Sequence, residues 1–281
     1  MIDDWQLDAI RREKAARIDP AVPNAARVAD FLNGDRNNFE ADRRAARVML
    51  SNAPAIAAIV PGVLAFQQRA VRFLAAHAGI RQFIDVGTGL PGVETNRDIF
   101  QSADPACRVV YVDNDPMVLS YVQAFSTSTP EGAVAALDGK LTAPAALLAG
   151  AAATLDLRRP VAVLLPSTLP FIRSNARAAA VLATLLAGLS PGSYLGLCHV
   201  ASDLDPAVGA GADQWNRMSA LRITLRSRAE VAGLTEGLDL VEPGLVPVNE
   251  WRPAAGGTGP GRPVPAYAVL GRKPRSAYRA G

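Results

Sequence analysis

The sequence predicts an α/β protein with a doubly wound, mostly parallel sheet and an N-terminal helical extension. Three observations carry this prediction. From about residue 80 onward, short apolar runs alternate with helical patterns. Runs such as VAVLL at 161–165 are apolar throughout, as in parallel strands covered on both faces. A glycine-rich turn follows the first of these runs, where a βαβ unit places its nucleotide-binding loop.

The first quarter of the chain is predicted to be helical. Residues 1–22 are polar, and helical patterns follow at 24–33, 41–50 and 53–77, with Gly34 and Gly79 as stops. Pro61 is expected to break or start a helix. No strong strand candidate interrupts this region. We therefore expect a helical extension that caps the site at 1–79 and a sheet domain at 80–281.

The remaining elements alternate in order along the sheet domain. Strands are expected at 82–86, 108–113, 133–137, 160–165 and 193–199, with helices at 93–103, 116–125, 142–152 and 174–188. A further helix is expected at 216–231, before late strands at 238–241 and 267–270. The Gly/Pro-rich stretch at 253–265 is typical of an exposed loop.

Composition limits the class of protein. The net charge is only +3 although the isoelectric point is about 9.1, and the arginines are scattered among acids without a basic stripe, which argues against nucleic-acid binding. No apolar run reaches membrane-spanning length and no signal peptide is recognisable, so we expect a cytoplasmic monomer or homodimer. Cys107 and Cys198 are expected to be buried free thiols. Two histidines are too few for a zinc site, so no metal is expected.

The glycine turn at 87–92 satisfies the G-x-G-x-x-G pattern of dinucleotide enzymes. Asp85, two residues before it, would repel the doubly negative pyrophosphate that such a turn binds. A carboxylate there suits a ligand with an amino group and a sulfonium, and S-adenosylmethionine carries both without a phosphate. The turn therefore favours S-adenosylmethionine, held by Asp85, Gly87, Thr88 and Gly89, with NAD as the alternative.

Polar residues follow the next two strands, at the edge where parallel sheets bind ligands. Asp113 would accept hydrogen bonds from the ribose hydroxyls, and Asn114 would lie beside the adenine. Asp138 would accept a hydrogen bond from the exocyclic amine of the adenine. Lys140 is the other candidate at this edge, although it can only donate.

The acceptor side of the site is defined by fewer residues. Pro166 and Ser167, after the fourth strand, would lie at the rim facing the transferred group, or would form a plain turn. His199 ends the fifth strand and is the candidate general base, with a core histidine as the alternative. A last group would close the site from the cap and from the far side: Asn38, Phe39, Arg43 and Trp251.

Several segments together resemble one known family. They are ARVADFLNG (26–34), QFIDVGTGLP (82–91), RVVYVDNDP (108–116), PGSYL (191–195), and EPGLVP (242–247) with WRP (251–253). Over nearly its whole length the chain resembles an actinobacterial family of S-adenosylmethionine-dependent methyltransferases. The resemblance implies the Rossmann-like class I methyltransferase fold, with S-adenosylmethionine as cofactor and S-adenosylhomocysteine as product. It implies no particular acceptor.

The chain also departs from that family at three places. KLTAP at 140–144 replaces an Asp-Leu-Arg-Asp-Pro run, Pro170-Phe171 replaces a His-Phe pair, and Asn96-Arg97 replaces an Asn-His pair. The first hypothesis is a methyltransferase acting on an oxygen or nitrogen of a small molecule, in specialised metabolism. The alternative is the same fold with a retained adenosyl cofactor, catalysing a cyclisation, elimination or hydrolysis. A third is a non-catalytic S-adenosylmethionine sensor.

Overall fold

The computed structural model describes residues 18–90, 99–125, 127–253 and 261–275. Several sequence predictions therefore fall outside the described residues. They are the polar segment at 1–17, the third glycine of the turn at Gly92, the Asn96-Arg97 departure, the start of the helix expected at 93–103 and much of the loop at 253–265.

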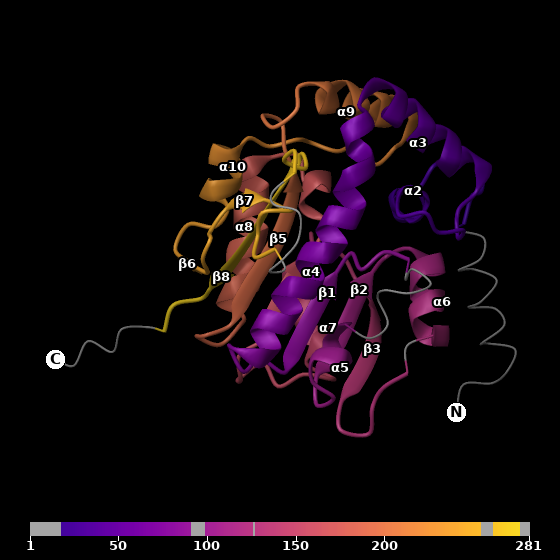
Figure 1. Cartoon of the computed structure of the whole chain (residues 1–281). Coiled ribbons are helices and arrows are strands. Elements are labelled where there is room, and N and C mark those ends of the chain that lie inside the picture. Colours follow the sequence, from indigo (N-terminus) through magenta and orange to yellow (C-terminus); the bar gives the residue numbers. More distant parts are fainter. Residues whose placement is uncertain (1–17, 91–98, 126, 254–260, 276–281) are drawn as a thin grey trace, which may run out of the picture.

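The described chain is organised around one eight-stranded sheet of order β3-β2-β1-β4-β5-β8-β6, with β7 also pairing with β8 (Figure 1). Five strands are parallel: β1 (Gln82–Val86), β2 (Arg108–Asp113), β3 (Ala133–Asp138), β4 (Ala162–Leu165) and β5 (Tyr194–Val200). Antiparallel pairing joins β8 (Ala266–Arg272) to β5, β6 (Asp239–Leu240) and β7 (Val246–Pro247). The doubly wound, mostly parallel sheet is confirmed. Its strand order reverses between β1 and β4, where such sheets bind ligands at the carboxyl edge.

Helices cover both faces of the sheet, which explains its apolar strands. One face packs against α4 (Ile59–Ala76), α5 (Ile99–Ala103) and α6 (Pro116–Phe125). The other packs against α7 (Pro144–Ala151), α8 (Asn175–Ala187) and α10 (Arg228–Gly233). Every residue of β1 is buried between these two layers. A strand covered on both faces needs no polar alternation, as the sequence indicated.

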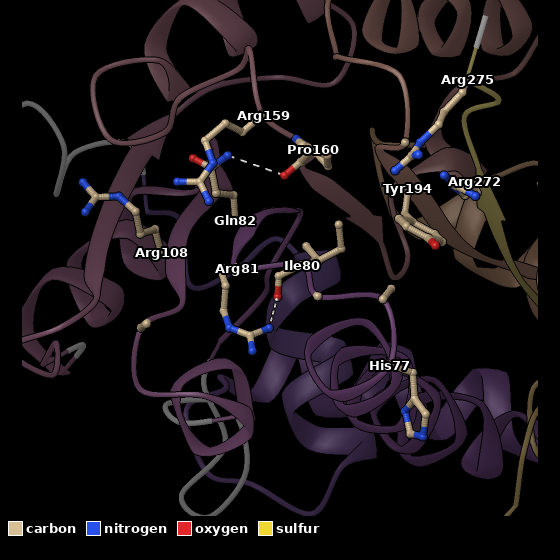
Figure 2. A pocket seen from close by; sticks show the side chains of 14 residues that line it. His77, Ile80, Arg81, Gln82, Arg108, Arg159, Pro160, Tyr194, Arg272 and Arg275 are labelled. Atoms are coloured by element: carbon tan, nitrogen blue, oxygen red, sulfur yellow. Dashed lines mark hydrogen bonds between the residues drawn. The ribbon is translucent and has the colours of Figure 1, made fainter. Parts of the chain in front are cut away.

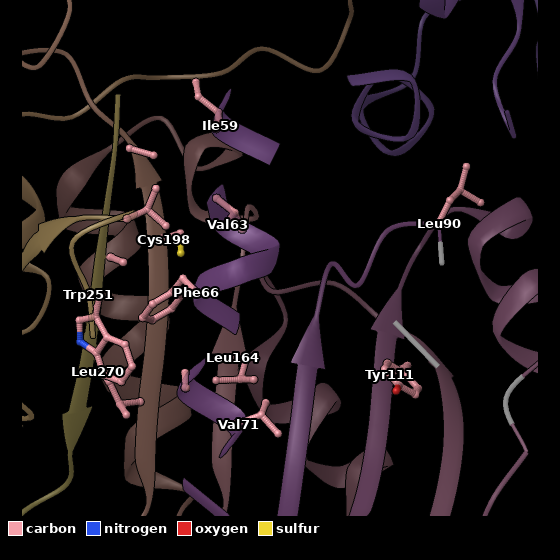
Figure 3. Close-up of a cluster of buried hydrophobic side chains, with 14 of the residues drawn as sticks. Ile59, Val63, Phe66, Val71, Leu90, Tyr111, Leu164, Cys198, Trp251 and Leu270 are labelled. Atoms are coloured by element: carbon pink, nitrogen blue, oxygen red, sulfur yellow. The ribbon is translucent and has the colours of Figure 1, made fainter. Parts of the chain in front are cut away.

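The predicted N-terminal helices form a layer continuous with the sheet. They are α2 (Ala25–Leu32), α3 (Glu40–Asn52), the short 3-10 helix η1 (Pro54–Ala58) and α4. Val63, Phe66 and Val71 on α4 lie in the same apolar cluster as Leu164 on β4 and Leu270 on β8 (Figure 3). The boundary expected at residue 79 therefore falls at the turn between α4 and β1, and both sides contribute to one core.

The stretch Pro54–Ala76 is the described helical stretch to which the expectation about apolar length applies. Gln67, Gln68, Arg69 and Arg72 interrupt it, so it is not an uninterrupted apolar run. Its 23 residues have a mean hydropathy of 1.2, so it is long and apolar enough to cross a membrane by length and composition. The core helix of a soluble protein passes the same test. Eight residues of α4 are buried, and its inner face packs against β5 and β8. The packing is that of a core helix.

The prediction of one helix at 216–231 is wrong. The chain instead forms α9 (Ala207–Met218) and α10, joined by a non-helical segment. The amide of Asn216 accepts from Ile223 N at 2.7 Å and donates to Ile223 O at 3.0 Å, which holds this segment away from helical geometry. Ser227 then starts α10 with a capping box to Glu230.

The prediction for the two cysteines is confirmed, since Cys107 and Cys198 are buried free thiols.

Candidate functional site

A crevice of about 240 Å³ opens at the carboxyl ends of β1, β2 and β4, and α2 covers it. Asn24, the N-cap of α2, joins this helix to the loop after β2, because its Nδ2 donates to Asp115 Oδ2 at 2.7 Å. The hydroxyl of Tyr121 on α6 donates to Asn37 Oδ1 at 2.8 Å, just beyond α2. Seven residues predicted from the sequence line the crevice: Gly87, Thr88, Gly89, Asp113, Asn114, Pro166 and Ser167.

The glycine turn brings the backbone close to the crevice. Gly87 has φ +71° and Gly89 has φ +69°, a left-handed conformation that favours glycine. The Gly87 N–H donates to Val112 O at 2.7 Å, which joins the turn to β2. A Cβ on Gly87 would collide with Thr168 Cγ2 from the loop after β4. The turn therefore requires glycine at 87 for space as well as for dihedral angles.

Asp85 lies beneath the turn with one carboxylate oxygen unpartnered. The side chain is 2% exposed and is not part of the crevice lining, and its Oδ2 accepts from Thr88 Oγ1 at 3.1 Å. Its Oδ1 has no partner at hydrogen-bonding distance among the described residues, and the side-chain amide of Gln67 is the neighbouring donor. Burial raises the pKa of the Asp85 carboxyl to about 7, and the nearby negative charge of Asp113 adds to the effect. A buried acceptor without a donor is rare in a native protein, so this oxygen is suited to a donor supplied by a ligand.

Asp113 is already a heavily used acceptor. Its Oδ1 accepts from the backbone N–H of Asn114 at 2.8 Å and of Asp115 at 2.9 Å, and its Oδ2 accepts from Gly89 N at 3.3 Å. Burial raises the pKa of Asp113, and these N–H donors oppose the rise. A carboxylate offers about four acceptor positions, so three are taken and about one remains for a ribose hydroxyl.

The cap contributes two polar residues that sequence reasoning did not single out. Asp30 on α2 and Gln67 on α4 both line the crevice and are each 4% exposed. Asp30 Oδ1 and Gln67 Nε2 have no hydrogen-bond partner. Burial raises the pKa of Asp30, as expected for a carboxyl taken out of water. Asp30 and Gln67 thus bring to the crevice two buried polar atoms without a partner among the described residues, and Asp85 holds a third beside Gln67, just outside the lining.

Three predicted cap residues support Asp30 and do not line the crevice themselves. Asn38 Nδ2 donates to Asp30 Oδ2 at 2.7 Å, and Arg43 Nη1 donates to Asn38 Oδ1 at 3.1 Å. The ring of Phe39 lies under the guanidinium of Arg27, 5.0 Å from its centroid. These contacts fix the loop between α2 and α3, and through it the position of Asp30.

Asp138 and Trp251 also lie outside the crevice lining. Asp138 is exposed at the end of β3, beside Asp113 in strand register. Trp251 is wholly buried, and its ring meets Phe66 at 5.1 Å in an edge-to-face contact. Figure 3 shows it among the core side chains beside α4. This position makes Trp251 a core residue and gives it no path to a bound substrate.

His199 is 1% exposed and lines neither the crevice nor the chamber described below. Its Nδ1 lies 2.9 Å from Val200 O, and its Nε2 lies 2.6 Å from Arg226 Nη1. A guanidinium can only donate, so Nε2 accepts and Nδ1 carries the hydrogen. Burial lowers the pKa of His199 to about 4. This geometry favours the core-histidine alternative over the general base.

Arg226 positions the rim of the site, and no sequence signal indicated it. It is wholly buried, and its guanidinium donates to Leu169 O at 3.2 Å, to Ile172 O at 2.6 Å and to Asn175 Oδ1 at 2.7 Å. These bonds hold the segment that contains η2 (Leu169–Phe171), the short helix after β4. Phe171 from this helix lines the crevice.

A second cavity, the apolar chamber, adjoins the crevice. It has a volume of about 140 Å³ and shares Ala25, Ala29, Val60, Ser167 and Phe171 with the crevice lining. Its other walls come from α2, α3, η1, α4, η2, β5, α9 and the segment after α9. These other lining residues are all apolar, so Ser167 in the shared lining is the polar exception among the described residues. They are Val28, Leu32, Met49, Ile56, Ile59, Pro170, Val200, Val208, Ala212, Trp215, Ile223 and Leu225. The Trp215 indole N–H is already bound to Leu221 O at 2.7 Å.

The two cavities differ sharply in charge. The described lining of the crevice carries four carboxylates and no arginine, lysine or histidine: Asp30, Asp35, Asp113 and Asp115. A pyrophosphate would meet repulsion here, whereas a ligand with a sulfonium and an ammonium would meet attraction. Nothing charged lines the described part of the apolar chamber. The arrangement fits a cationic cofactor beside a neutral partner.

Comparison with known proteins agrees with this geometry. A sequence model of the S-adenosyl methyltransferase family matches residues 11–274. A DUF574 family protein from Streptomyces avermitilis has a similar solved structure, with 36% identity, a TM-score of 0.86, and coverage of 92% of this chain and 100% of its own. A provisionally assigned methyltransferase from Thermobifida fusca is 33% identical, with a TM-score of 0.81 and coverage of 91% and 96%. No curated protein matches the chain.

Proposed function

Because the chain belongs to the S-adenosyl methyltransferase family, we propose that it methylates a nitrogen or oxygen of a small, largely apolar molecule held in the apolar chamber. S-adenosylmethionine is the cofactor, and S-adenosylhomocysteine is the expected product. The observation that carries the proposal is the contact between the acidic crevice and the apolar chamber. Ser167 and Phe171 line both, so a cofactor in one can face an acceptor in the other.

The chain's own residues would bind and orient the two reactants. Asp85, with Gln67 beside it at the crevice lining, would receive the cofactor's ammonium, and the remaining acceptor position of Asp113 would take a ribose hydroxyl. When bound, the cofactor supplies a methyl group on a positively charged sulfur. Transfer requires sulfur, methyl and nucleophile in line, so positioning supplies much of the acceleration. Residues of α2 and η2 line both cavities at this junction.

The chamber supplies no proton acceptor of its own. None of its described lining residues has a side chain that titrates near neutral pH. The nucleophile would therefore attack with a lone pair it already has, as an unprotonated nitrogen or an ionised phenol does. Ser167 is exposed at the shared rim, where its hydroxyl could hold that nucleophile by a hydrogen bond. Catalysis by orientation suits a site with this lining.

The size and neutrality of the chamber support the rest of the proposal. A volume of about 140 Å³ suits a small molecule, and the uncharged walls suit the apolar compounds of specialised metabolism. Within the described residues, one copy of the chain forms both cavities, which is consistent with a monomer or a homodimer. Size-exclusion chromatography of the full chain would distinguish the monomer from the homodimer. The proposed location of the protein is the cytoplasm.

A pair of substitutions on one helix tests the acceptor site. Ala212 on α9 is 6% exposed and lines the chamber, whereas Ala210 on the same helix is exposed. We expect Ala212→Phe to fill the chamber and abolish formation of S-adenosylhomocysteine across a panel of aryl amines and phenols. Its affinity for S-adenosylhomocysteine should stay unchanged, and Ala210→Phe should leave both properties intact. Full turnover in Ala212→Phe, or turnover of an acceptor without S-adenosylhomocysteine, would contradict the proposal.

A further inference from the structure

A third cavity lies at the opposite edge of the sheet from the crevice. It has a volume of about 480 Å³ and is formed at the amino ends of β1, β2 and β5, the segment before β4, and the end of the antiparallel β8 (Figure 2). Five arginines from these separate elements line it: Arg81, Arg108, Arg159, Arg272 and Arg275. We call this cavity the arginine hollow. No aspartate or glutamate is among its described lining residues.

Among the described residues, a close carboxylate neutralises one of the five guanidinium groups. Arg81 pairs with Asp104 at 2.7 Å and also donates to the carbonyls of Ala75 and Ile80. Arg108 donates from Nε to the Thr154 carbonyl at 2.8 Å, which orients it without cancelling its charge. Within the described residues, Arg159, Arg272 and Arg275 form no ion pair. The hollow thus concentrates positive charge, of which Asp104 and the neighbouring Asp156 balance only part.

The backbone around the hollow is held in place. Gln82 at the start of β1 donates to Asp156 O at 2.9 Å and accepts from Asp156 N at 2.7 Å, which fixes the segment that carries Arg159. On the other side of the hollow, the turn before β5 passes close to Arg272. Its Gly192 has the left-handed φ of +85°, and a Cβ there would lie 3.9 Å from Arg272 Nη2. In Figure 2, Arg108 and Arg159 lie on one side, and Arg272 and Arg275 lie on the other beside Tyr194.

We propose that the arginine hollow binds a small ligand carrying two or more phosphate-type groups. Guanidinium groups match phosphate oxygens through paired, charge-assisted hydrogen bonds, and like charges gathered in a concave site favour a multivalent anion. The cationic groups on two sides of one cavity suit a compact ligand. A nucleic acid would instead require a stripe of charge along the surface, and the chain's net charge is only +3.

Isothermal titration of the full chain with tripolyphosphate, at constant ionic strength, tests this site. We expect one equivalent to bind per chain. The double variant Arg159→Gln/Arg272→Gln should lose about tenfold or more in affinity, because two charged donors disappear. The matched control is Arg158→Gln, because Arg158 neighbours the hollow but does not line it and pairs with Asp156 at 2.9 Å. Arg158→Gln should bind as the unmodified chain does.

Three results would overturn the proposal. They are the absence of saturable binding, an equal loss of affinity in the Arg158→Gln control, and tighter binding of a short single-stranded RNA than of tripolyphosphate. Affinity for S-adenosylhomocysteine should be the same in all variants, since the crevice lies at the other edge of the sheet. That second titration also shows that each variant is folded. The inference is independent of the acceptor chemistry proposed above.

Discussion

Replacing Asp85 by asparagine should stabilise the ligand-free protein while weakening cofactor binding. The pKa of this carboxyl is about 7 in the folded chain, against an ordinary value of 3.8. The folded state therefore keeps a proton that the unfolded state releases, and the free energy of unfolding falls as pH rises from about 4 to 7. At about 1.4 kcal/mol per pH unit, the loss reaches roughly 4 kcal/mol near neutral pH. An asparagine side chain cannot ionise, so Asp85→Asn should remove up to that loss.

The same carboxyl should make ligand binding depend on pH. A ligand ammonium pairs with ionised Asp85, so below pH 7 the protein must first lose a proton. We expect the affinity for S-adenosylhomocysteine to fall about tenfold for each pH unit below 7. In Asp85→Asn the affinity should be lower than in the unmodified chain at pH 7 and should depend much less on pH from 5 to 7. Calorimetric titration measures the affinity, and urea unfolding at the same pH values measures stability.

The matched control is Asp138→Asn, which makes the same chemical change at the exposed end of β3. Asp138 is exposed whereas Asp85 is buried, so neither the stability profile nor the binding profile should change in Asp138→Asn. If Asp85→Asn keeps the steep pH dependence of binding, another group is responsible and the reasoning about Asp85 is refuted. Asp113 would then be the next candidate, because burial raises the pKa of its carboxyl too.

Three other substitutions test the roles assigned above. His199→Asn should change turnover by less than about threefold, whereas loss of a general base would cost roughly a hundredfold or more; production of S-adenosylhomocysteine measures the difference. Gly87→Ala should abolish cofactor binding because of the collision with Thr168, while Gly237→Ala, with φ +78° and open space around it, should not. Arg226→Met should lower the free energy of unfolding by roughly 3 kcal/mol, because it leaves buried acceptors unpaired. An unchanged urea midpoint would show that these hydrogen bonds do not stabilise the segment after β4.

The sheet could be predicted because its signals are local. Each parallel strand is a short apolar run, and the turn at Gly87 depends on residues within a few positions of it. The segment after β5 could not be predicted in the same way. The boundary of α9 depends on the Asn216 amide bonding to Ile223, and β7 is only two residues long and exists through pairing with β8. Such elements are decided by tertiary contacts, which a periodicity does not contain.

The donor side of the site was predictable for a topological reason. Parallel strands end at one edge, so the residues after β1, β2 and β4 must meet there. Asp30 and Gln67 reach that edge only because α2 and α4 dock over it, and helical periodicity alone does not show where a cap will lie. His199 shows the opposite error. Its position at a strand end suggested chemistry, but Arg226, which approaches from the segment after α9, occupies its acceptor nitrogen.

The small net charge of the chain includes two local concentrations of charge of opposite sign, one negative and one positive. In the part of the chain that the structure describes, carboxylates without cations line the crevice at the carboxyl edge of the sheet, and five arginines line the hollow at the amino edge. Summed over the chain these contributions nearly cancel, which is why composition suggested neither an acidic nor a basic ligand. Locally they do not cancel, because charges at opposite edges of the sheet are screened from each other by solvent salt. The acidic edge favours S-adenosylmethionine over its product, since only the former carries the sulfonium charge. Release of the uncharged thioether after transfer is therefore favoured by the same carboxylates that attract the cofactor.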